Sequence, residues 1–292
     1  MRLAIAVVAA AAAMAVAGAA EAGRAKDEAG VAGPSAVGAS VEIRDAVVRV
    51  TVIPEERNDV KVEFVTTNKD LPLRVSTSGA LTTIDGGLGR RINDCHGRRE
   101  HPTVWVRRVG SVEYKDMPQV VIRTPRDVVV DAGGAVFGVI GRAGSVDLHN
   151  SGCSAWTVAD ASGDVTLRES GAGDVRMGSA GRLSLHLSGA GEVRATQVRQ
   201  GLDATLSGAG SVTINDLSGP LQAHVSGVGK IRVVDGHAGA VHASVSGLGS
   251  VDFGGRADSL DASISGIGSI RVKQVTGQVT KSVSGGGHVS VG

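Results

Sequence analysis

Apolar and polar residues alternate strictly over short stretches in the second half of the chain. In residues 202–206, 221–225, 241–245 and 260–264 every second residue is apolar. The positions between them hold Asp, Thr, Gln, His or Ser. A period of two predicts β-strands that bury one face and expose the other.

Each of these stretches leads into a Ser-Gly pair, and the pairs recur at a nearly constant interval of 18 to 20 residues. The serines of the pairs are Ser151, Ser170, Ser188, Ser207, Ser226, Ser246, Ser265 and Ser284. Ala132-Gly133-Gly134 is interpreted as a degenerate first copy. Alternation resumes after each Ser-Gly-x-Gly, so each repeat consists of two short strands joined by a tight glycine corner, with a looser turn before the next repeat.

Repeats this short cannot bury an apolar face alone, so they must stack on one another. They could form a parallel solenoid or a series of antiparallel hairpins. The residue between the two glycines is apolar in most copies, for example Val228, Leu248 and Ile267, whereas a hairpin tip is more often polar. We therefore predict an all-β, right-handed parallel β-solenoid of about eight coils of ~19 residues over residues 127–292, with the corner side chains pointing into the core.

The residues before the repeats predict export and a separate set of strands. Arg2 precedes an apolar run and small residues that fit a cleavage site, so residues 1–22 are interpreted as a signal peptide. Residues 23–40 are predicted to be a disordered lead-in. Residues 41–126 are predicted to be N-terminal β-strands that cover the open end of the solenoid, with a basic loop at residues 85–102. The mature chain is predicted to have no transmembrane span.

Composition adds two constraints. The chain has 30 Lys and Arg against 29 Asp and Glu, so its net charge of +1 does not indicate a nucleic-acid partner. It has 43 Gly but only two Trp, one Tyr and three Phe, so its core must be built from Val, Ala, Leu and Ile.

The serial Ser-Gly-x-Gly-x-Val motif, the opening stretch Val41–Val65 and the stretch Met117–Val136 resemble one known family. This is the "putative auto-transporter adhesin, head GIN domain" family of exported bacterial β-solenoids, and the resemblance extends over residues 41–292. It implies the same architecture and an adhesion role. It supplies no catalytic residues and no cofactor.

Arg90, Arg91, Arg98 and Arg99 form a candidate anion-binding patch in the basic loop, because guanidinium groups bind carboxylates and phosphates well. A metal site built from Cys95 and nearby histidines is a weaker interpretation, since the spacing matches no paired-cysteine zinc motif. The remaining interpretation is a solvated polar loop. We predict no metal site and no cofactor.

Asp131, Asn150 and Glu169 occupy the position just before the corner in three consecutive repeats, where later repeats have an apolar residue. They form a candidate polar cluster, predicted to point inward under the N-terminal strands. An exposed acid cluster would instead indicate a carbohydrate-active enzyme. Few aromatic residues are available to stack on a sugar: Trp105, Tyr114 and Trp156, of which Trp156 is predicted to point inward.

Cys95 and Cys153 are the only cysteines, and an exported chain enters an oxidising compartment. We predict that they form a disulfide, which would fix the basic loop to the solenoid.

The sequence thus predicts a non-enzymatic cell-envelope module, adhesin-like, that binds through rigid solenoid faces in the periplasm or at the cell surface. Its predicted partner is an envelope polysaccharide or another envelope protein. The alternative function is that of a polysaccharide lyase or hydrolase of the β-helix type.

Overall fold

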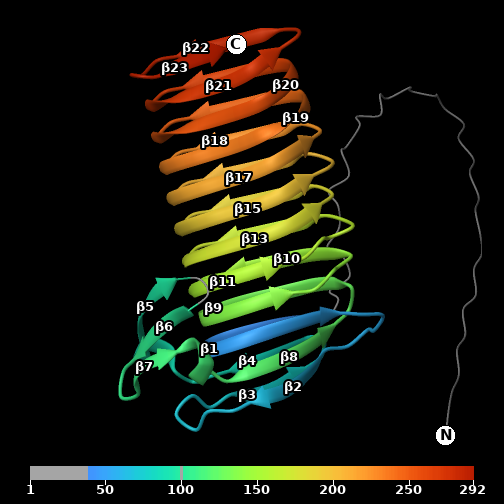
Figure 1. Ribbon diagram of the computed structural model, residues 1–292, viewed down its shortest axis with the longest axis vertical. Coiled ribbons are helices and arrows are strands. Elements are labelled where there is room, and N and C mark those ends of the chain that lie inside the picture. The colour runs from blue at the N-terminus through green and yellow to red at the C-terminus, as the bar shows by residue number, and fades with distance from the viewer. Residues whose placement is uncertain (1–38, 99–100) are drawn as a thin grey trace, which may run out of the picture. The chain divides into compact units, whose positions relative to one another are not determined.

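The computed structural model describes residues 39–98 and 101–292, which form an all-β protein built around a stack of parallel coils (Figure 1). The segments predicted to be a signal peptide and a lead-in, residues 1–22 and most of 23–40, lie outside the described residues. No helix in the described part of the chain is long and apolar enough to cross a membrane.

Residues 127–292 form the predicted parallel β-solenoid, with about nine turns. The degenerate copy Ala132-Gly133-Gly134 forms the corner of the first coil, which adds one coil to the eight predicted. The solenoid strands are β9 (Asp127–Ile140), β10 (Ser145–Asn150), β11 (Cys153–Val158), β12 (Val165–Glu169), β13 (Ala172–Ala180), β14 (Leu183–Leu187), β15 (Ala190–Val198), β16 (Leu202–Leu206), β17 (Ala209–Ser218), β18 (Leu221–Val225), β19 (Val228–Val245), β20 (Leu248–Ile264), β21 (Ile267–Val275), β22 (Val279–Val283) and β23 (His288–Val291).

The coils stack in register, so equivalent residues form columns along the solenoid. One inward column contains Ala204, Ala223, Ala243 and Ala262, which pair in succession and are at most 4% exposed. The inward position predicted for Trp156 is confirmed: its side chain is fully buried, opposite Gly138 of the preceding coil. A side chain at Gly138 would overlap the indole ring, so glycine there makes room for the tryptophan.

The predicted N-terminal strands cover one end of the solenoid. They are β1 (Ser40–Pro54), β2 (Lys61–Thr66), β3 (Arg74–Ser78), β4 (Leu81–Asp85), β5 (Ile92–Arg98), β6 (His101–Val106), β7 (Gly110–Glu113) and β8 (Gln119–Thr124), with short 3-10 helices η1 (Gly89–Arg91) and η2 (Tyr114–Asp116). β1 pairs in parallel with β9 on one side and with β4 and β8 on the other. β2 and β3 then pair antiparallel with β8 and β4, which ends the parallel stack.

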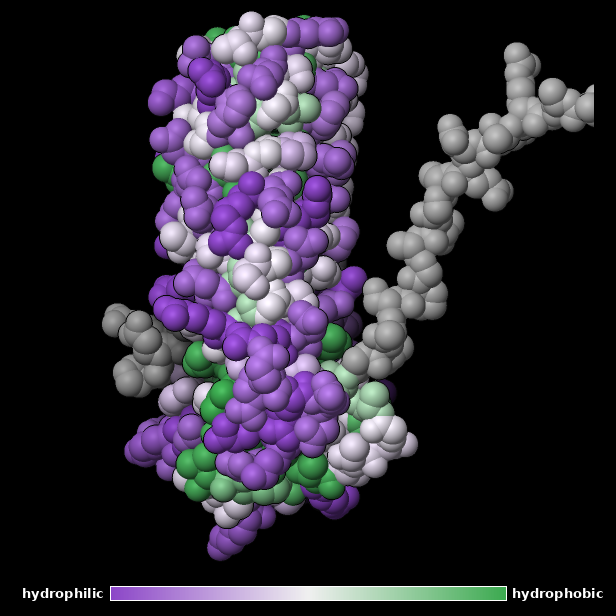
Figure 2. Space-filling view, turned by 90° about the vertical axis from the view of Figure 1, so that its right-hand side faces the viewer, coloured by the Kyte–Doolittle hydropathy of each residue, from purple (hydrophilic) through white to green (hydrophobic). Residues whose placement is uncertain are grey.

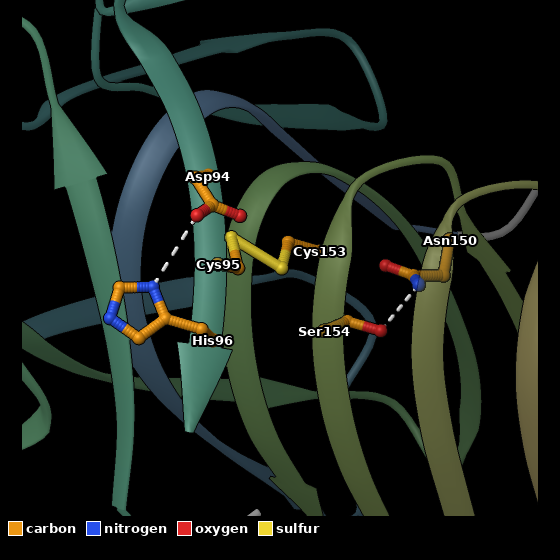
Figure 3. Close-up of a disulfide and its surroundings, with 6 residues drawn as sticks. All are labelled: Asp94, Cys95, His96, Asn150, Cys153 and Ser154. Atoms are coloured by element: carbon orange, nitrogen blue, oxygen red, sulfur yellow. Dashed lines mark hydrogen bonds and ion pairs between the residues drawn. A yellow bond between two sulfur atoms is a disulfide. The ribbon is translucent and has the colours of Figure 1, made fainter. Parts of the chain in front are cut away.

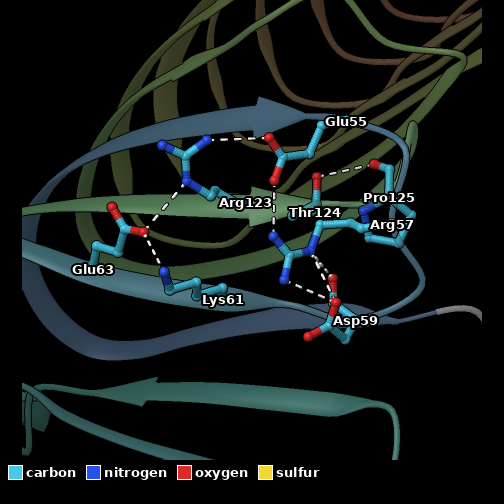
Figure 4. A network of polar contacts seen from close by, with 8 residues as sticks. All are labelled: Glu55, Arg57, Asp59, Lys61, Glu63, Arg123, Thr124 and Pro125. Carbon is cyan, nitrogen blue, oxygen red and sulfur yellow. Dashed lines mark hydrogen bonds and ion pairs between the residues drawn. The ribbon is translucent and has the colours of Figure 1, made fainter.

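An ionic network fixes the β1–β2 turn to β8 (Figure 4). Arg123 contacts Glu55 at 3.1 Å and Glu63 at 3.4 Å, and Arg57 contacts Glu55 at 2.8 Å. The hydrogen bond from Arg57 lowers the pKa of Glu55, with a further contribution from Arg123. Each exposed pair contributes little to stability by itself, so the role of the network is to hold the turn in one geometry.

The side of the solenoid that carries the loose turns is predominantly hydrophilic along the coils, with hydrophobic residues gathered near the base (Figure 2). The most exposed large apolar side chains of the coils, Val228, Leu248 and Ile267, lie at the glycine corners.

Candidate functional site

The corner side chains point into solvent, so their predicted inward orientation was wrong. Val228, Leu248 and Ile267 are 57%, 54% and 64% exposed. They pair in register with one another and follow three exposed alanines, Ala172, Ala190 and Ala209. We call these six residues the corner column. The chain reverses so sharply at the glycines that the residue between them lies outside the bend, while the alternating positions on either side fill the core.

Beside the first coils lies a separate three-stranded antiparallel sheet, in the order β5-β6-β7, which we call the tethered sheet (Figure 1). It replaces much of the predicted basic loop at residues 85–102. Val104, Val106 and Val112 on its inner face are buried in a cluster with Val47 of β1 and Phe137 of β9. The sequence did contain a signal for the sheet, because buried valines alternate with outward-facing residues around Trp105. The many charged residues just before this stretch led instead to the prediction of a loop.

A disulfide joins Cys95 of β5 to Cys153 at the start of β11, with 6.3 Å between their Cα atoms (Figure 3). Cys153 occupies the corner position of the preceding coil, where it pairs with Ala172, the first member of the corner column. Its thiol can reach the tethered sheet because corner side chains point outward. Together the disulfide and the buried valines fix the sheet at two places.

An open cleft of about 480 Å³ lies between β5 and the corners of the first coils. Its lining includes Asn93 and Asp94 of β5, Asp45 of β1, and Ser151 and Gly171 at the corners. His96 lies near the cleft, and its Nδ1 is 3.5 Å from a carboxylate oxygen of Asp94 (Figure 3).

Of the four arginines predicted to form one anion-binding patch, Arg90 and Arg91 are not placed beside Arg98 by the backbone. Arg90 and Arg91 lie in η1, at the start of β5, whereas Arg98 is the last residue of β5. A strand of seven residues is about 20 Å long. The side chain of Arg98 and the whole of Arg99 lie outside what the structure describes.

The predicted polar cluster is divided. Asn150 and Glu169 point inward as predicted and are each 2% exposed. Asp131 was predicted to join them, but its side chain is exposed. Its Oδ2 lies 3.4 Å from Nδ1 of His149. The reason is the spacing of the first repeat: Ala132 pairs with Asn150, 18 residues later, so the inward position belongs to Ala132. A register difference of one residue moves a side chain to the opposite face.

Asn150 donates a hydrogen bond from Nδ2 to Glu169 Oε2 at 2.6 Å, and also to Ser154 (Figure 3). The other carboxylate oxygen of Glu169, Oε1, accepts a hydrogen bond from the backbone N–H of Gly171, with 3.1 Å between the nitrogen and the oxygen. Burial raises the pKa of Glu169 to about 7, although both hydrogen bonds favour the charged form. A substrate cannot reach these two side chains, so they form a buried structural pair.

Within residues 39–98 and 101–292, no group of three or more His, Cys, Asp and Glu side chains is arranged to hold a metal ion. Cys95, considered as a ligand from the sequence, is joined to Cys153.

These features define a class: a rigid, repeat-built β-solenoid module that carries an exposed apolar column and a small tethered sheet. Residues 197–292, the C-terminal third of the chain, match the model of a family described as "Putative auto-transporter adhesin, head GIN domain". Over these residues the predicted resemblance to this family is confirmed.

Three solved structures align with most of this chain. They are a "putative adhesin" from Bacteroides fragilis (17% identity, 87% of this chain and 93% of that chain covered, TM-score 0.41), a "putative lipid binding protein" from Parabacteroides distasonis (17% identity, 88% and 94% covered, TM-score 0.45) and a "putative cell adhesion protein" from Clostridium sporogenes (8% identity, 84% and 93% covered, TM-score 0.22). These similarities are too low to transfer a function. No curated protein matches the chain.

Proposed function

We propose that the protein is a non-enzymatic, exported module of the cell envelope that binds a surface polymer or another envelope protein through its solenoid. It would act in the periplasm or at the cell surface. The observation that carries this proposal is the corner column, which holds three large, solvent-exposed apolar side chains in register.

Two further observations support it. The three large residues of the corner column lie within residues 197–292, the part that matches the adhesin-type family. The repeated backbone holds them at the strand spacing of ~4.8 Å, so little conformational entropy is lost when a partner binds along the column.

The alternative enzymatic function required an accessible acid cluster. Asn150 and Glu169 are buried and Asp131 faces away from them, so this cluster offers no pair of carboxylates to a substrate.

Binding of the purified protein to a glycan array, and to an insoluble cell-envelope fraction, tests the proposal. A variant with Val228, Leu248 and Ile267 all changed to Ser should lose most binding. A matched control changes Val129, Val139 and Val234, which are 39%, 48% and 44% exposed elsewhere on the solenoid, and should bind as the wild type does. Wild-type protein that binds neither glycans nor envelope would overturn the proposal, and so would full binding by the corner-column variant.

A further inference from the structure

The outer face of the tethered sheet carries a small grid of side chains around an exposed tryptophan. In one row of the sheet, Asp94 of β5 lies opposite Trp105 of β6, which lies opposite Ser111 of β7. In the next row, Thr103 lies between His96 and Glu113. The residues between these on each strand, including Cys95, Val104 and Val112, point to the solenoid, so all six members of the grid share the outer face.

Trp105 is 47% exposed, whereas the other tryptophan of the chain, Trp156, is fully buried. An indole ring left this open in a chain with so few aromatics gives up a large gain from burial, since a large aromatic buries 150–250 Å² when it is covered. Its position on the sheet is not required by the core, because Val104 and Val106 on either side provide the inward contacts.

The neighbours of Trp105 indicate which kind of molecule would cover it. Every other member of the grid has a hydrogen-bonding side chain, and among the described residues of these two rows Trp105 has no large apolar partner. The centre of a protein–protein interface would be richer in apolar groups. A sugar ring has one apolar C–H face that suits the negative face of an indole, and hydroxyl groups around its rim that need acceptors and donors.

We propose that the outer face of the tethered sheet is a saccharide-binding subsite in which Trp105 stacks on a pyranose ring. Asp94 and Ser111, opposite Trp105 in the same row, bind the hydroxyl groups at the two edges of the ring. Thr103 and the carboxylate of Glu113 contact the next part of the sugar chain. This subsite is separate from the corner column and adds a ligand class to the proposed binding function without depending on that column.

The surroundings fix the subsite in advance. The disulfide and the buried valines attach the sheet to the solenoid, so the grid is already ordered before a ligand arrives, which reduces the entropic cost of binding. Asp94 also lines the cleft beside β5. A polysaccharide that stacks on Trp105 and continues across β5 would therefore enter the cleft, whose volume is in the range of small-molecule sites.

The two tryptophans make a direct test possible with the full protein. Trp105 should contribute red-shifted fluorescence because it is exposed, and buried Trp156 should contribute blue-shifted fluorescence. Titration with dextran, galactomannan and alginate should quench or shift only the red component for at least one polymer. Trp105→Ala, measured by calorimetric titration because it lacks the red component, should weaken binding of that polymer by about tenfold or more.

Asp94→Asn and Ser111→Ala provide further variants that keep the tryptophan, and each should weaken binding by about tenfold if it loses a well-formed hydrogen bond. Thr205→Ala, on a distant face of the solenoid, is the control and should bind as wild type. A red component that none of the three polymers changes overturns the subsite, as does a Trp105→Ala variant with unchanged affinity. If the array or the envelope fraction still binds wild-type protein, the proposed function survives that result.

Discussion

The glycine of each Ser-Gly pair lies against the backbone of the preceding coil, with no room for a side chain. At Gly208 an added Cβ would lie closer than 3.0 Å to the backbone carbonyl oxygen of Gly189 in the preceding coil. The backbone at Gly208 is not in the left-handed region. Glycine is therefore required by the contact between coils, since any L-residue could adopt this backbone conformation.

Gly208→Ala should lower the free energy of unfolding by about 1–3 kcal/mol, because the backbones must separate to admit the methyl group. Gly239 provides the matched control, since no atom lies within 4 Å of the point that a Cβ would occupy there and its φ is ordinary. Gly239→Ala should change stability by about 0.5 kcal/mol or less. Urea denaturation of both variants measures the difference, and equal effects would contradict the close-approach explanation.

The buried Glu169 gives the protein a specific pH dependence. Its pKa is raised to about 7 by burial, so the folded protein holds a proton that the unfolded chain releases near 4.5. The contribution of Glu169 to the free energy of unfolding should be greatest below the unfolded value and should fall by about 2–3 kcal/mol as pH rises from about 4.5 through 7. Glu169→Gln should remove this decrease and be more stable than wild type at pH 8.

Urea denaturation at pH 5 and pH 8 measures this effect. Glu192→Gln, a change at a partly exposed side chain paired with Arg194 at 2.7 Å, should keep the wild-type profile. A Glu169→Gln variant with the same pH dependence as wild type would show that another group is responsible.

At the scale of strands, the alternating pattern predicted which side chains fill the core. The inward column of alanines follows directly from residues 202–206 and the equivalent stretches, and all four are buried. Because these alanines stack on one another, a larger side chain at one of them has no space to occupy.

Ala223→Leu or Ala243→Leu should therefore lower the free energy of unfolding by about 1–3 kcal/mol through overpacking. Thr205→Leu, on the outer face of β16, should have little effect. Thermal melts of the three variants distinguish the two classes, and indistinguishable melting temperatures would mean that the assignment of inner and outer faces is wrong.

Periodicity failed at particular strands for identifiable reasons. A uniform repeat of 19 residues places Asp131 in the core, whereas the pairing of Ala132 with Asn150 makes the first repeat 18 residues long. The direction of the corner residues depends on how sharply the backbone bends, which composition does not reveal. β1 pairs with β9 on one side and with β4 and β8 on the other. These partners are distant in sequence, so no local pattern of residues indicates the pairing.

At the scale of the molecule, the disulfide joins the tethered sheet to the solenoid across 58 residues of sequence. On the chain-entropy account, closing a loop of this length stabilises the folded state by up to ~4 kcal/mol. Reduction, or the paired change of Cys95 and Cys153 to Ser, should lower the free energy of unfolding by an amount of this order. The tethered sheet should then open at a lower denaturant concentration than the solenoid.

Thiol titration of the denatured, unreduced protein measures the oxidised state directly, and no free thiol is expected. Two titratable thiols per chain would contradict the disulfide. Hydrogen exchange then reports on the sheet: amides of β5 and β6 should exchange faster after reduction, while those of β16 and β18 should not change.

The placement of β1 also determines how the molecule would respond to mechanical force. β1 is held by backbone ladders on both sides, whereas β22 and β23 each pair with a single strand of the described chain. Tension applied at residue 40 along β1 would load many hydrogen bonds at once in shear, and they must break together. Tension applied at residue 291 would peel the last described coil one bond at a time, so under load the solenoid should unravel from that coil and remain anchored at its N-terminal strands.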